Sequence, residues 1–297
     1  MDSLATTRRD LSQYLTQAEA VILPRPLSEK VEPAPLPPEL KLRVGVDLGT
    51  AYLVLVVTDE YGTPLAGEWQ FAQVVRDGVV LDYLGAIDLL VSMKQRIEQR
   101  IGRQLTHAAS GYSPGVPSAE IRATAHVVEG AGMNCSGLID EPSAANNVLR
   151  LREGAIVDVG GGTTGIAVLH EGEVIYTADE ATGGTHFSLV IAGSLGISFE
   201  EAEALKTTPD EQPRLLSLVS PVMEKVASIA ERHIRGKDVN LITMVGGSSA
   251  FIGMADTVQN YIGIPTQVVR HPMFVTPLGL ALHDPPRSEE RPCRERV

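Results

Sequence analysis

The sequence predicts a two-lobed α/β fold in which one structural plan occurs twice, with a ligand cleft between the copies. Two stretches share one pattern, VGVDLGTAYLVLV at residues 44–56 and AIVDVGGGTTGIAV at residues 155–168. In each, an apolar strand leads to an aspartate, a glycine turn with threonine follows, and a second apolar strand begins. The chain has 297 residues, which is about two domains of ~150 residues each. In such folds, loops from both halves converge on the bound ligand.

Apolar runs and turn residues set out the first copy. The runs LRVGVDL and YLVLVVTD predict strands at residues 42–48 and 52–59, and the turn Tyr-Gly-Thr-Pro after them predicts a hairpin. Helical periodicity follows at residues 81–101. The further elements expected in this half are a strand at 104–110 and helices at 117–129 and 142–151.

The second copy begins again with strand, glycine turn and strand, in GAIVDVGGGTTGIAVL at residues 154–169. EVIYTA adds a third strand, and residues 184–234 are mostly helical in pattern. A late strand in VNLITMV and a helix at 250–261 complete this half.

Both ends of the chain differ from the body. Apolar residues at helical spacing after Asp10, a suitable N-cap, predict a short amphipathic helix. Residues 24–38 hold six of the 19 prolines, which is typical of an extended, semi-rigid linker. The last residues are charged and proline-rich, so we expect them to be disordered. The expected organisation is a helix plus linker at 1–40, lobe I at 41–150 and 277–284, lobe II at 151–276, and a disordered tail at 285–297.

Composition and charge exclude several classes of protein. With 25 basic and 37 acidic residues the formal net charge is −12, which disfavours binding to a nucleic acid polymer or to an anionic membrane surface. No apolar run approaches the ~20 residues that cross a bilayer. Cys135 and Cys293 cannot build a disulfide framework, and a bacterial cytoplasm is the expected location. The pair Arg8-Arg9 is not followed by an export signal, because Gln and Glu interrupt the next segment.

The two glycine turns predict a polyphosphate site. Glycine turns expose backbone N–H groups where no side chain blocks a phosphate, and threonine adds a hydroxyl donor. Asp47 and Asp158 lie beside the two turns, so their carboxylates are expected to point at the phosphates. They would repel a phosphate unless a cation lay between them, and Mg²⁺ with its retained waters suits that position.

A single DxGT or GGG is more often an ordinary strand turn. Three further motifs, however, strengthen the prediction of a polyphosphate site. MVGGSS at residues 244–249 follows a strand and opens a helix, and its glycines leave room for a base and ribose. EPSAAN at 141–146 lies between the first two loops, and TPLGLA at 276–281 follows the third loop. Their order along the chain makes coincidence a poor explanation.

These motifs resemble those of the actin, DnaK-type chaperone and sugar-kinase superfamily. They follow that superfamily's order of first phosphate loop, first connecting helix, second phosphate loop, adenosine loop and second connecting helix. The resemblance implies a duplicated actin-like, ribonuclease H-like ATPase fold that binds ATP or ADP with Mg²⁺. Residues 74–87, 158–169, 176–189 and 197–206 are similar to a family of chaperone-like proteins of bacterial ethanolamine utilization. That likeness implies ethanolamine ammonia-lyase or microcompartment proteins as partners.

The resemblance also implies individual roles. Asp47 and Asp158 match the residues at Mg²⁺ and its waters, and Glu141 matches an acid that could orient an attacking water. Together these three are the candidate catalytic residues. Glu203 and Lys206, one helical turn apart, match the pair that brackets ribose and adenine. The other residues that match nucleotide contacts are Gly49, Thr50, Gly160, Gly161, Gly162, Thr163, Gly183, Gly184, Gly246, Gly247 and Ser248.

The sequence also departs from the DnaK type. Those chaperones place a lysine of the first half near the attacking water, but here no lysine occurs between Lys41 and Lys94. Gly165 stands where they carry a second aspartate after the phosphate loop. Residues 59–105 are too short for their large insertion, and the residues given after 284 leave no room for a β-rich peptide-binding domain, so we expect none here. ATP binding is therefore expected, whereas a weak Mg²⁺-dependent ATPase activity stays open.

Two other functions remain as alternatives to the chaperone-like one. A nucleotide-dependent filament or scaffold, similar to bacterial actins and pilus-assembly homologues, agrees with the short insertion and would make the chain a homo-oligomer. A small-molecule kinase is the weaker alternative, because no further polar pocket motif is present. The N-terminal helix and its linker resemble the encapsulation peptides that dock cargo on microcompartment shells, and the competing interpretation is a helix packed on its own body.

Overall fold

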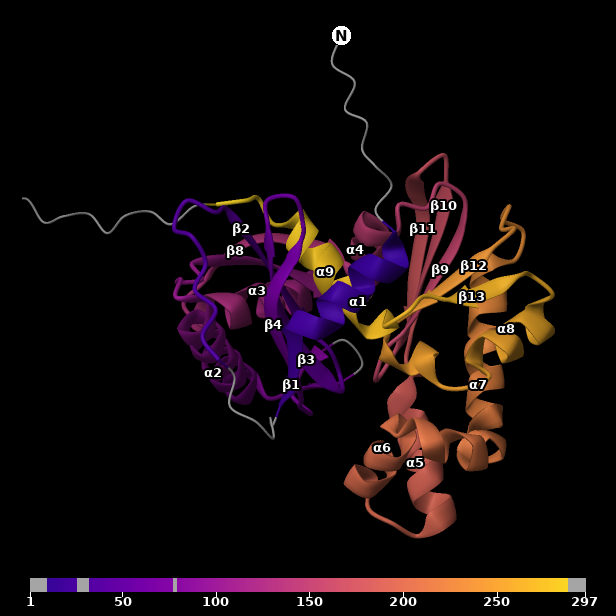
Figure 1. Cartoon of the computed structure of the whole chain (residues 1–297). Helices are drawn as coiled ribbons and strands as arrows, with labels where there is room; N and C mark the ends of the chain where they lie inside the picture. Colours follow the sequence, from indigo (N-terminus) through magenta and orange to yellow (C-terminus); the bar gives the residue numbers. More distant parts are fainter. Residues whose placement is uncertain (1–9, 26–31, 77–78, 288–297) are drawn as a thin grey trace, which may run out of the picture.

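The computed structural model describes residues 10–25, 32–76 and 79–287. Two β-sheets stand side by side in it, each with its own helices (Figure 1). We call the part around the six-stranded sheet lobe I and the part around the five-stranded sheet lobe II. Two helices, α4 (Glu141–Leu149) and α9 (Val275–His283), lie between the sheets.

The sheet of lobe I has the order β1-β4-β3-β2-β7-β8. Strands β2, β3 and β4 form an antiparallel meander, while β7 and β8 continue parallel to β2. The bounds are β1 Ile22–Arg25, β2 Leu42–Leu48, β3 Tyr52–Asp59, β4 Pro64–Phe71, β7 His107–Tyr112 and β8 Asn134–Asp140. A small separate hairpin consists of β5 Val75–Arg76 and β6 Val79–Val80.

The sheet of lobe II repeats this plan. Its order is β11-β10-β9-β12-β13, again an antiparallel meander with two parallel strands added beside its first strand. The bounds are β9 Gly154–Val159, β10 Thr164–His170, β11 Glu173–Glu180, β12 Ile242–Val245 and β13 Thr266–Val268. Apart from β1, both lobes thus have the order third, second, first, fourth, fifth strand. The predicted duplicated α/β fold is confirmed.

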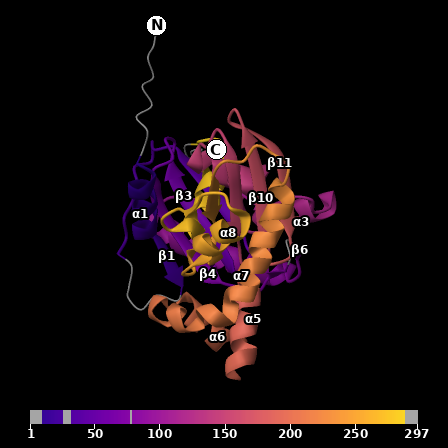
Figure 2. The same cartoon turned by 90° about the vertical axis from the view of Figure 1, so that its right-hand side faces the viewer.

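Helices cover each sheet and form separate hydrophobic cores with it. In lobe I these are α2 (Tyr83–Ile101) and α3 (Ser118–Gly130). In lobe II, α5 (Gly184–Leu195), α7 (Gln212–Ile234) and α8 (Met254–Ile262) supply the core residues, with α6 (Phe199–Thr207) beside α5. Figure 2 shows α7 and α8 on the side of lobe II away from lobe I. Short 3₁₀ turns η1 (Pro209–Glu211), η2 (Gly247–Ala250) and η3 (Pro272–Phe274) connect the later elements.

Helices α4 and α9 correspond to the two predicted connecting helices, and they cross closely. A Cβ added at Gly279 would lie 1.9 Å from the carbonyl oxygen of Ala144. Only glycine permits this approach of the two backbones. The Asn147 side chain also donates a hydrogen bond to the Gly279 carbonyl at 3.1 Å. The crossing joins the lobes at one side of the cleft.

The N-terminal helix forms as predicted and Asp10 caps it. The helix is α1 (Leu11–Val21), and an Asp10 carboxylate oxygen accepts the N–H groups of Ser12 and Gln13 at 3.0 and 3.4 Å. The expectation that this segment lies outside both lobes is wrong, because β1 pairs in parallel with β4 as the sixth strand of lobe I. Tyr14, Leu15, Ala18 and Ile22 are buried against the body.

Other differences concern short or polar segments. Strand β8 begins Asn-Cys-Ser-Gly and β13 has three residues, so neither carries an apolar run that identifies a strand. Part of the proline-rich segment, residues 26–31, lies outside the described residues, and residues 32–38 pass along the end of α2, where the Leu36 N–H bonds the Ile101 carbonyl at 2.8 Å. Of the predicted tail only 285–287 are described, and Arg287 forms a β-bridge with Leu42; residues 288–297 lie outside the described part.

Candidate functional site

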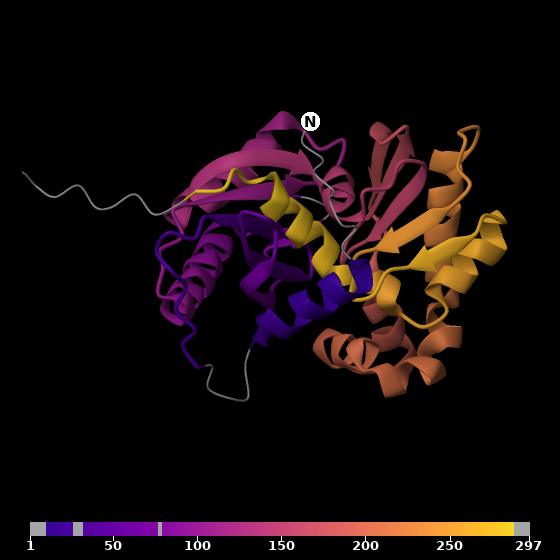
Figure 3. The same ribbon diagram turned by 45° about the horizontal axis from the view of Figure 1, so that its top comes forward.

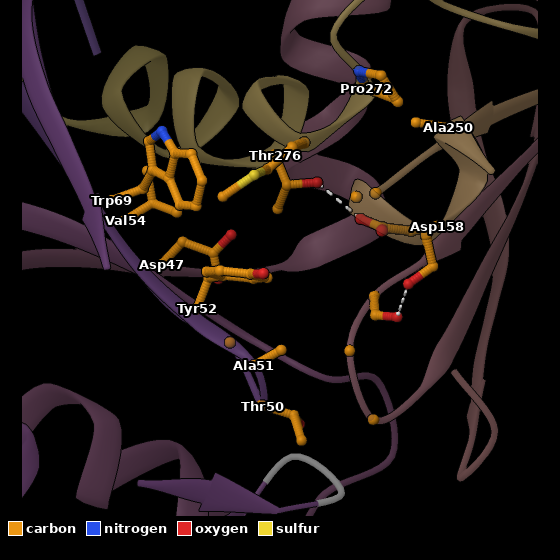
Figure 4. A pocket seen from close by; sticks show the side chains of 18 of the residues that line it. Asp47, Thr50, Ala51, Tyr52, Val54, Trp69, Asp158, Ala250, Pro272 and Thr276 are labelled. Atoms are coloured by element: carbon orange, nitrogen blue, oxygen red, sulfur yellow. Dashed lines mark hydrogen bonds between the residues drawn. The ribbon is translucent and has the colours of Figure 1, made fainter. Parts of the chain in front are cut away.

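One cavity of about 420 Å³ lies between the lobes. Loops of both sheets line it: the turn after β2, the turn after β9, and the turn after β12 (Figure 4). These are the three glycine loops that the sequence singles out. The tertiary structure therefore brings together loops that are more than 80 residues apart in the chain.

The first two loops touch each other across the cleft. A Cβ added at Gly161 would lie 2.6 Å from the Cβ of Ala51, and one added at Gly162 would lie 2.5 Å from the Thr50 hydroxyl. Any side chain at these positions would push the loops apart. Gly49, Thr50, Gly160, Gly161, Gly162 and Thr163 all line the cavity.

Three predicted carboxylates face one another here. Asp47 lies near the end of β2, Asp158 near the end of β9, and Glu141 begins α4. Desolvation, together with the charge of Asp158, raises the pKa of Asp47 to about 7. Desolvation and the charges of Asp47 and Asp158 raise the pKa of Glu141 well above its ordinary value. Carboxylates that raise one another's pKa values gain from a cation placed between them.

Two residues beside this cluster were not among the predicted site residues. The Thr276 hydroxyl donates a hydrogen bond to Asp158 Oδ2 at 2.7 Å (Figure 4), which counteracts the rise in the Asp158 pKa that burial causes. Asp179 on β11 pairs in register with Gly165, and its charge also raises the Glu141 pKa. Thus Gly165 lacks a carboxylate, but the neighbouring strand brings one alongside it. No local motif reveals Asp179, because only strand pairing places it there.

Glu203 and Lys206 line the cavity as a buried pair on α6. Lys206 Nζ lies 2.6 Å from Glu203 Oε2, and the Ser188 hydroxyl donates to the same oxygen at 2.5 Å. From lobe I, the Tyr52 hydroxyl donates to Glu203 Oε1 at 3.0 Å. Lys206 is the one lysine or arginine among the described residues that line the cavity. The cavity is therefore acidic, and a phosphate ligand would need an accompanying cation.

The third loop joins the second one. Gly246 has φ +84°, a left-handed conformation that favours glycine, and a Cβ there would meet the Asp158 carboxylate at 2.2 Å. The Ser248 hydroxyl donates to the Gly160 carbonyl at 2.8 Å. Gly246, Gly247 and Ser248 line the cavity, as expected of residues that lie along a ligand.

Gly183 and Gly184 are the two predicted site residues that do not line the cavity. They lie at the start of α5, behind the second glycine loop. The Gly184 N–H bonds the Gly160 carbonyl at 2.9 Å, and the Thr185 N–H bonds the Gly161 carbonyl at 2.7 Å. In this structure, the start of α5 therefore supports the loop from behind.

Sequence reasoning also missed one wall of the cavity. Trp69 and Val54 line it from lobe I (Figure 4). Met273 lines it from lobe II. Trp69 packs edge-to-face on Tyr52, with ring centroids 5.2 Å apart. Glu19 of the N-terminal helix and His271 complete this side. Apart from Val54, which belongs to the strand after the first glycine loop, they lie in segments without a recognisable motif, so tertiary contacts alone assign them to the site.

The described residues form neither a self-contained metal site nor a membrane-spanning helix. No group of three or more histidine, cysteine, aspartate or glutamate side chains in the described part could hold a metal ion by itself. A cation would therefore need oxygen atoms of the ligand or of water besides Asp47 and Asp158. Across residues 10–287, apart from the gaps, no helix has the length and apolar character needed to cross a membrane.

The curated relatives decide the family. The chain is 41% identical over 248 residues to the ethanolamine utilization protein EutJ of Escherichia coli, which covers 83% of this chain and 87% of that protein. It is 40% identical over the same length to EutJ of Salmonella typhimurium. The chain belongs to the EutJ family. The EutJ crystal structure from Carboxydothermus hydrogenoformans agrees, with 43% identity, a TM-score of 0.82, and coverage of 92% of this chain and 98% of that one.

More distant matches are to actin-like proteins and to a chaperone. The family model of the cell division protein FtsA matches residues 155–279. MreB 5 of Spiroplasma citri, solved with AMPPNP bound, superposes with a TM-score of 0.63 at 16% identity, covering 80% of this chain and 94% of that one. That likeness shows the actin-like fold. A chaperone HscA homologue of Burkholderia thailandensis is 24% identical over 69% of this chain and 42% of its own length.

In this EutJ-family protein, the two arginines of the first half that could replace the missing lysine, Arg43 and Arg76, lie outside the cavity lining. The Arg43 guanidinium donates to the carbonyls of Glu60, Leu282 and Asp284, at 3.1, 3.0 and 2.8 Å. Within the described residues, neither Arg43 nor Arg76 lines the cavity. Val75 and Ser113 line it instead. Neither arginine thus stands in for the lysine that the sequence lacks.

Proposed function

We propose that this EutJ-family protein binds ATP or ADP with Mg²⁺ in the cleft and acts as a chaperone-like component of ethanolamine utilization. The observation that carries the proposal is the convergence of three glycine loops and two facing aspartates on one cavity of about 420 Å³. The loops offer backbone N–H groups to phosphates. Asp47 and Asp158 would hold Mg²⁺ through their oxygens, the ligand type that this ion prefers.

The adenosine end of the proposed site lies in lobe II. Glu203 and Lys206 would bracket ribose and base, and Gly246, Gly247 and Ser248 would lie along them. Gly183 and Gly184 would keep the second phosphate loop in place from behind. The MreB structure with bound AMPPNP supports a nucleotide in a cleft of this fold.

Hydrolysis would be weak. Glu141 begins α4 at the cavity and is the proposed acid that orients a water. Its raised pKa favours the protonated form in the ligand-free cleft, and a bound cation would favour the carboxylate. Among the described residues that line the cavity, the one lysine or arginine is Lys206, which is paired with Glu203, and this supports a slow reaction.

The biological role follows from the family and from the chaperones that match. We propose the bacterial cytoplasm, at or near a microcompartment, as the location. The proposed partners are ethanolamine ammonia-lyase or microcompartment proteins, which would respond to closure of the lobes. The similarity to HscA homologues supports the chaperone-like role. A pull-down with and without ATP would identify the partner.

Fluorescence of Trp69 tests nucleotide binding directly, because Trp69 is the one tryptophan of the chain and lines the cavity. We expect a saturable change in emission when MgATP is added, and a much smaller change when EDTA is present. Isothermal titration provides the independent measurement. The absence of both heat and thermal shift with MgATP and MgADP would reject the proposal.

Sedimentation separates this proposal from a filament. A chaperone-like protein stays in the supernatant with or without ATP, whereas a nucleotide-dependent filament pellets only with it. Phosphoryl transfer from ATP to ethanolamine in a coupled assay would instead indicate a kinase.

A further inference from the structure

The segment Asp10–Arg25 contacts both lobes. Helix α1 packs on β4 of lobe I and touches η3, the turn of lobe II that leads into α9 (Figure 3, indigo helix beside the end of the yellow helix α9). Leu15, Ala18 and Ile22 are at most 1% exposed. Their burial fixes this segment on the body.

The attachment to lobe I is extensive. The Tyr14 hydroxyl donates to the Gly62 carbonyl in the β3–β4 turn at 2.9 Å. Arg100 of α2 donates to the Val21 carbonyl at 2.9 Å. Strand β1 then pairs with β4, with Ile22 opposite Gly67. A Cβ at Gly67 would lie 3.0 Å from the Ile22 side chain, so the fit is close.

The attachment to lobe II combines apolar packing with a polar contact of Glu19. The buried residues of the helix belong to an apolar cluster that also contains Ile156 and Val245 of lobe II. Glu19 Oε1 lies 3.1 Å from His271 Nδ1. The other ring nitrogen, Nε2, is 3.2 Å from the Arg270 Nε–H and accepts its hydrogen bond. Nδ1 therefore carries the proton and donates it to Glu19. His271 has φ +47°, an uncommon conformation for a residue other than glycine.

His271 leads directly to the ligand loops. The carbonyl of the next residue, Pro272, accepts the Gly246 N–H at 3.0 Å. Gly246 precedes η2, whose Ser248 binds the second glycine loop. Glu19 and His271 themselves line the cavity. A continuous chain of contacts thus runs from the N-terminal helix to the loops proposed to hold the nucleotide.

We propose that Asp10–Arg25 is a strap that couples docking of the N-terminal helix to closure of the cleft. The lobes are closed in this structure, because Thr50 touches Gly162 and Tyr52 bonds Glu203. The Glu19 to His271 pair forms in this closed arrangement. Because coupling is reciprocal, a ligand that stabilises closure also stabilises the docked strap, and a docked strap raises affinity for that ligand. The ligand part of this inference rests on the proposed nucleotide function.

Hydrogen exchange and affinity test the strap in the full-length protein. MgATP should slow amide exchange in residues 11–25. Glu19→Gln should speed exchange of residues 271–274 and of the Gly246 loop in ligand-free protein. It should also weaken MgATP binding about two- to fivefold, the size expected when the charged acceptor of one partly exposed hydrogen bond becomes neutral. Glu39→Gln removes another exposed charge outside the strap and should change none of these.

A second variant should give a larger effect, in case the effect of Glu19→Gln is too small to measure. Leu15→Glu places a charge at a fully buried position of the strap and should weaken MgATP binding more than Glu19→Gln. If this variant does not fold, Glu19→Gln alone decides. Unchanged exchange at residues 271–274 in ligand-free Glu19→Gln would overturn the strap. Failure of the wild-type protein to bind MgATP would instead reject the nucleotide, and the ligand-free exchange would still decide on the strap.

Discussion

The Tyr52 hydroxyl of lobe I donates a hydrogen bond to Glu203 of lobe II across the mouth of the cavity, with 3.0 Å between the oxygens. Tyr52 stands directly after the first glycine loop, and Glu203 is already bonded to Lys206 and Ser188. Desolvation and the Glu203 charge raise the pKa of Tyr52, so it remains a donor over the neutral range. The bond therefore belongs to the closed cleft.

Removal of this hydroxyl should favour opening of the lobes. Tyr52→Phe keeps the ring that packs on Trp69 and loses one hydrogen bond to a charged partner. We expect nucleotide affinity to fall roughly 3- to 10-fold, measured by isothermal titration. Tyr83→Phe, at a residue 38% exposed on α2, is the matched control and should bind as the wild type does. Equal affinities of the two variants would show that the bond does not contribute to closure.

Stability should depend on pH and on Mg²⁺ through Asp47. The folded-state pKa is about 7 against 3.8 in the unfolded chain, so the folded state holds the proton more tightly. The free energy of unfolding therefore falls as pH rises from 3.8 to about 7. Mg²⁺ should restore stability at pH 8, where the carboxylates are ionised. Thermal melts at pH 6 and pH 8, with and without Mg²⁺, measure this.

The variant Asp47→Asn separates charge from shape in the same experiment. Without Mg²⁺ at pH 8 it should melt a few degrees above the wild type, because the repulsion from Asp158 is gone. Mg²⁺ should no longer stabilise it. Asp88→Asn, an exposed position on α2, should leave both results unchanged. A lower melting temperature for Asp47→Asn would contradict the repulsion argument.

The Thr276 hydroxyl should matter for the metal rather than for packing. Thr276→Val keeps the volume of this buried side chain but removes the donor to Asp158. The pKa of Asp158 should then rise further, because the hydrogen bond lowers it. We expect MgATP affinity to fall roughly tenfold, as for a lost hydrogen bond to a charged group. Thr276→Ser should recover most of it; failure of serine to do so would assign the effect to packing.

The contact between the two phosphate loops predicts different effects for neighbouring glycines. Gly161→Ala places a Cβ 2.6 Å from Ala51 and should lower the melting temperature of the ligand-free protein. Gly160→Ala meets only the Thr163 carbonyl at 3.6 Å, an ordinary contact, and should leave it unchanged. Differential scanning fluorimetry compares them. Similar melting temperatures of the two variants would mean that the close contact between the loops does not contribute to stability.

The predicted elements and the observed ones agree where the signal is local. The strands before and after Gly49 and Gly160, and the helices at α2, α3 and α4, follow from apolar periodicity and turn residues. Strands β1, β8 and β13 did not, because they are short, polar or at a sheet edge. Their pairing depends on neighbours supplied by distant parts of the chain.

The sequence by itself determined the duplicated plan and the loop residues of the candidate site, since the glycines that permit close approach occur in recognisable local patterns. Tertiary structure alone decided that Asp179 lies beside Gly165, that Thr276 bonds Asp158, and that the N-terminal helix reaches His271. The tertiary structure also places Gly183 and Gly184 behind the second glycine loop and not on the cavity wall. Each of these depends on strand order or on packing between residues far apart in the chain. Spacing along one segment does not encode such contacts, because they form only when whole sheets and helices assemble.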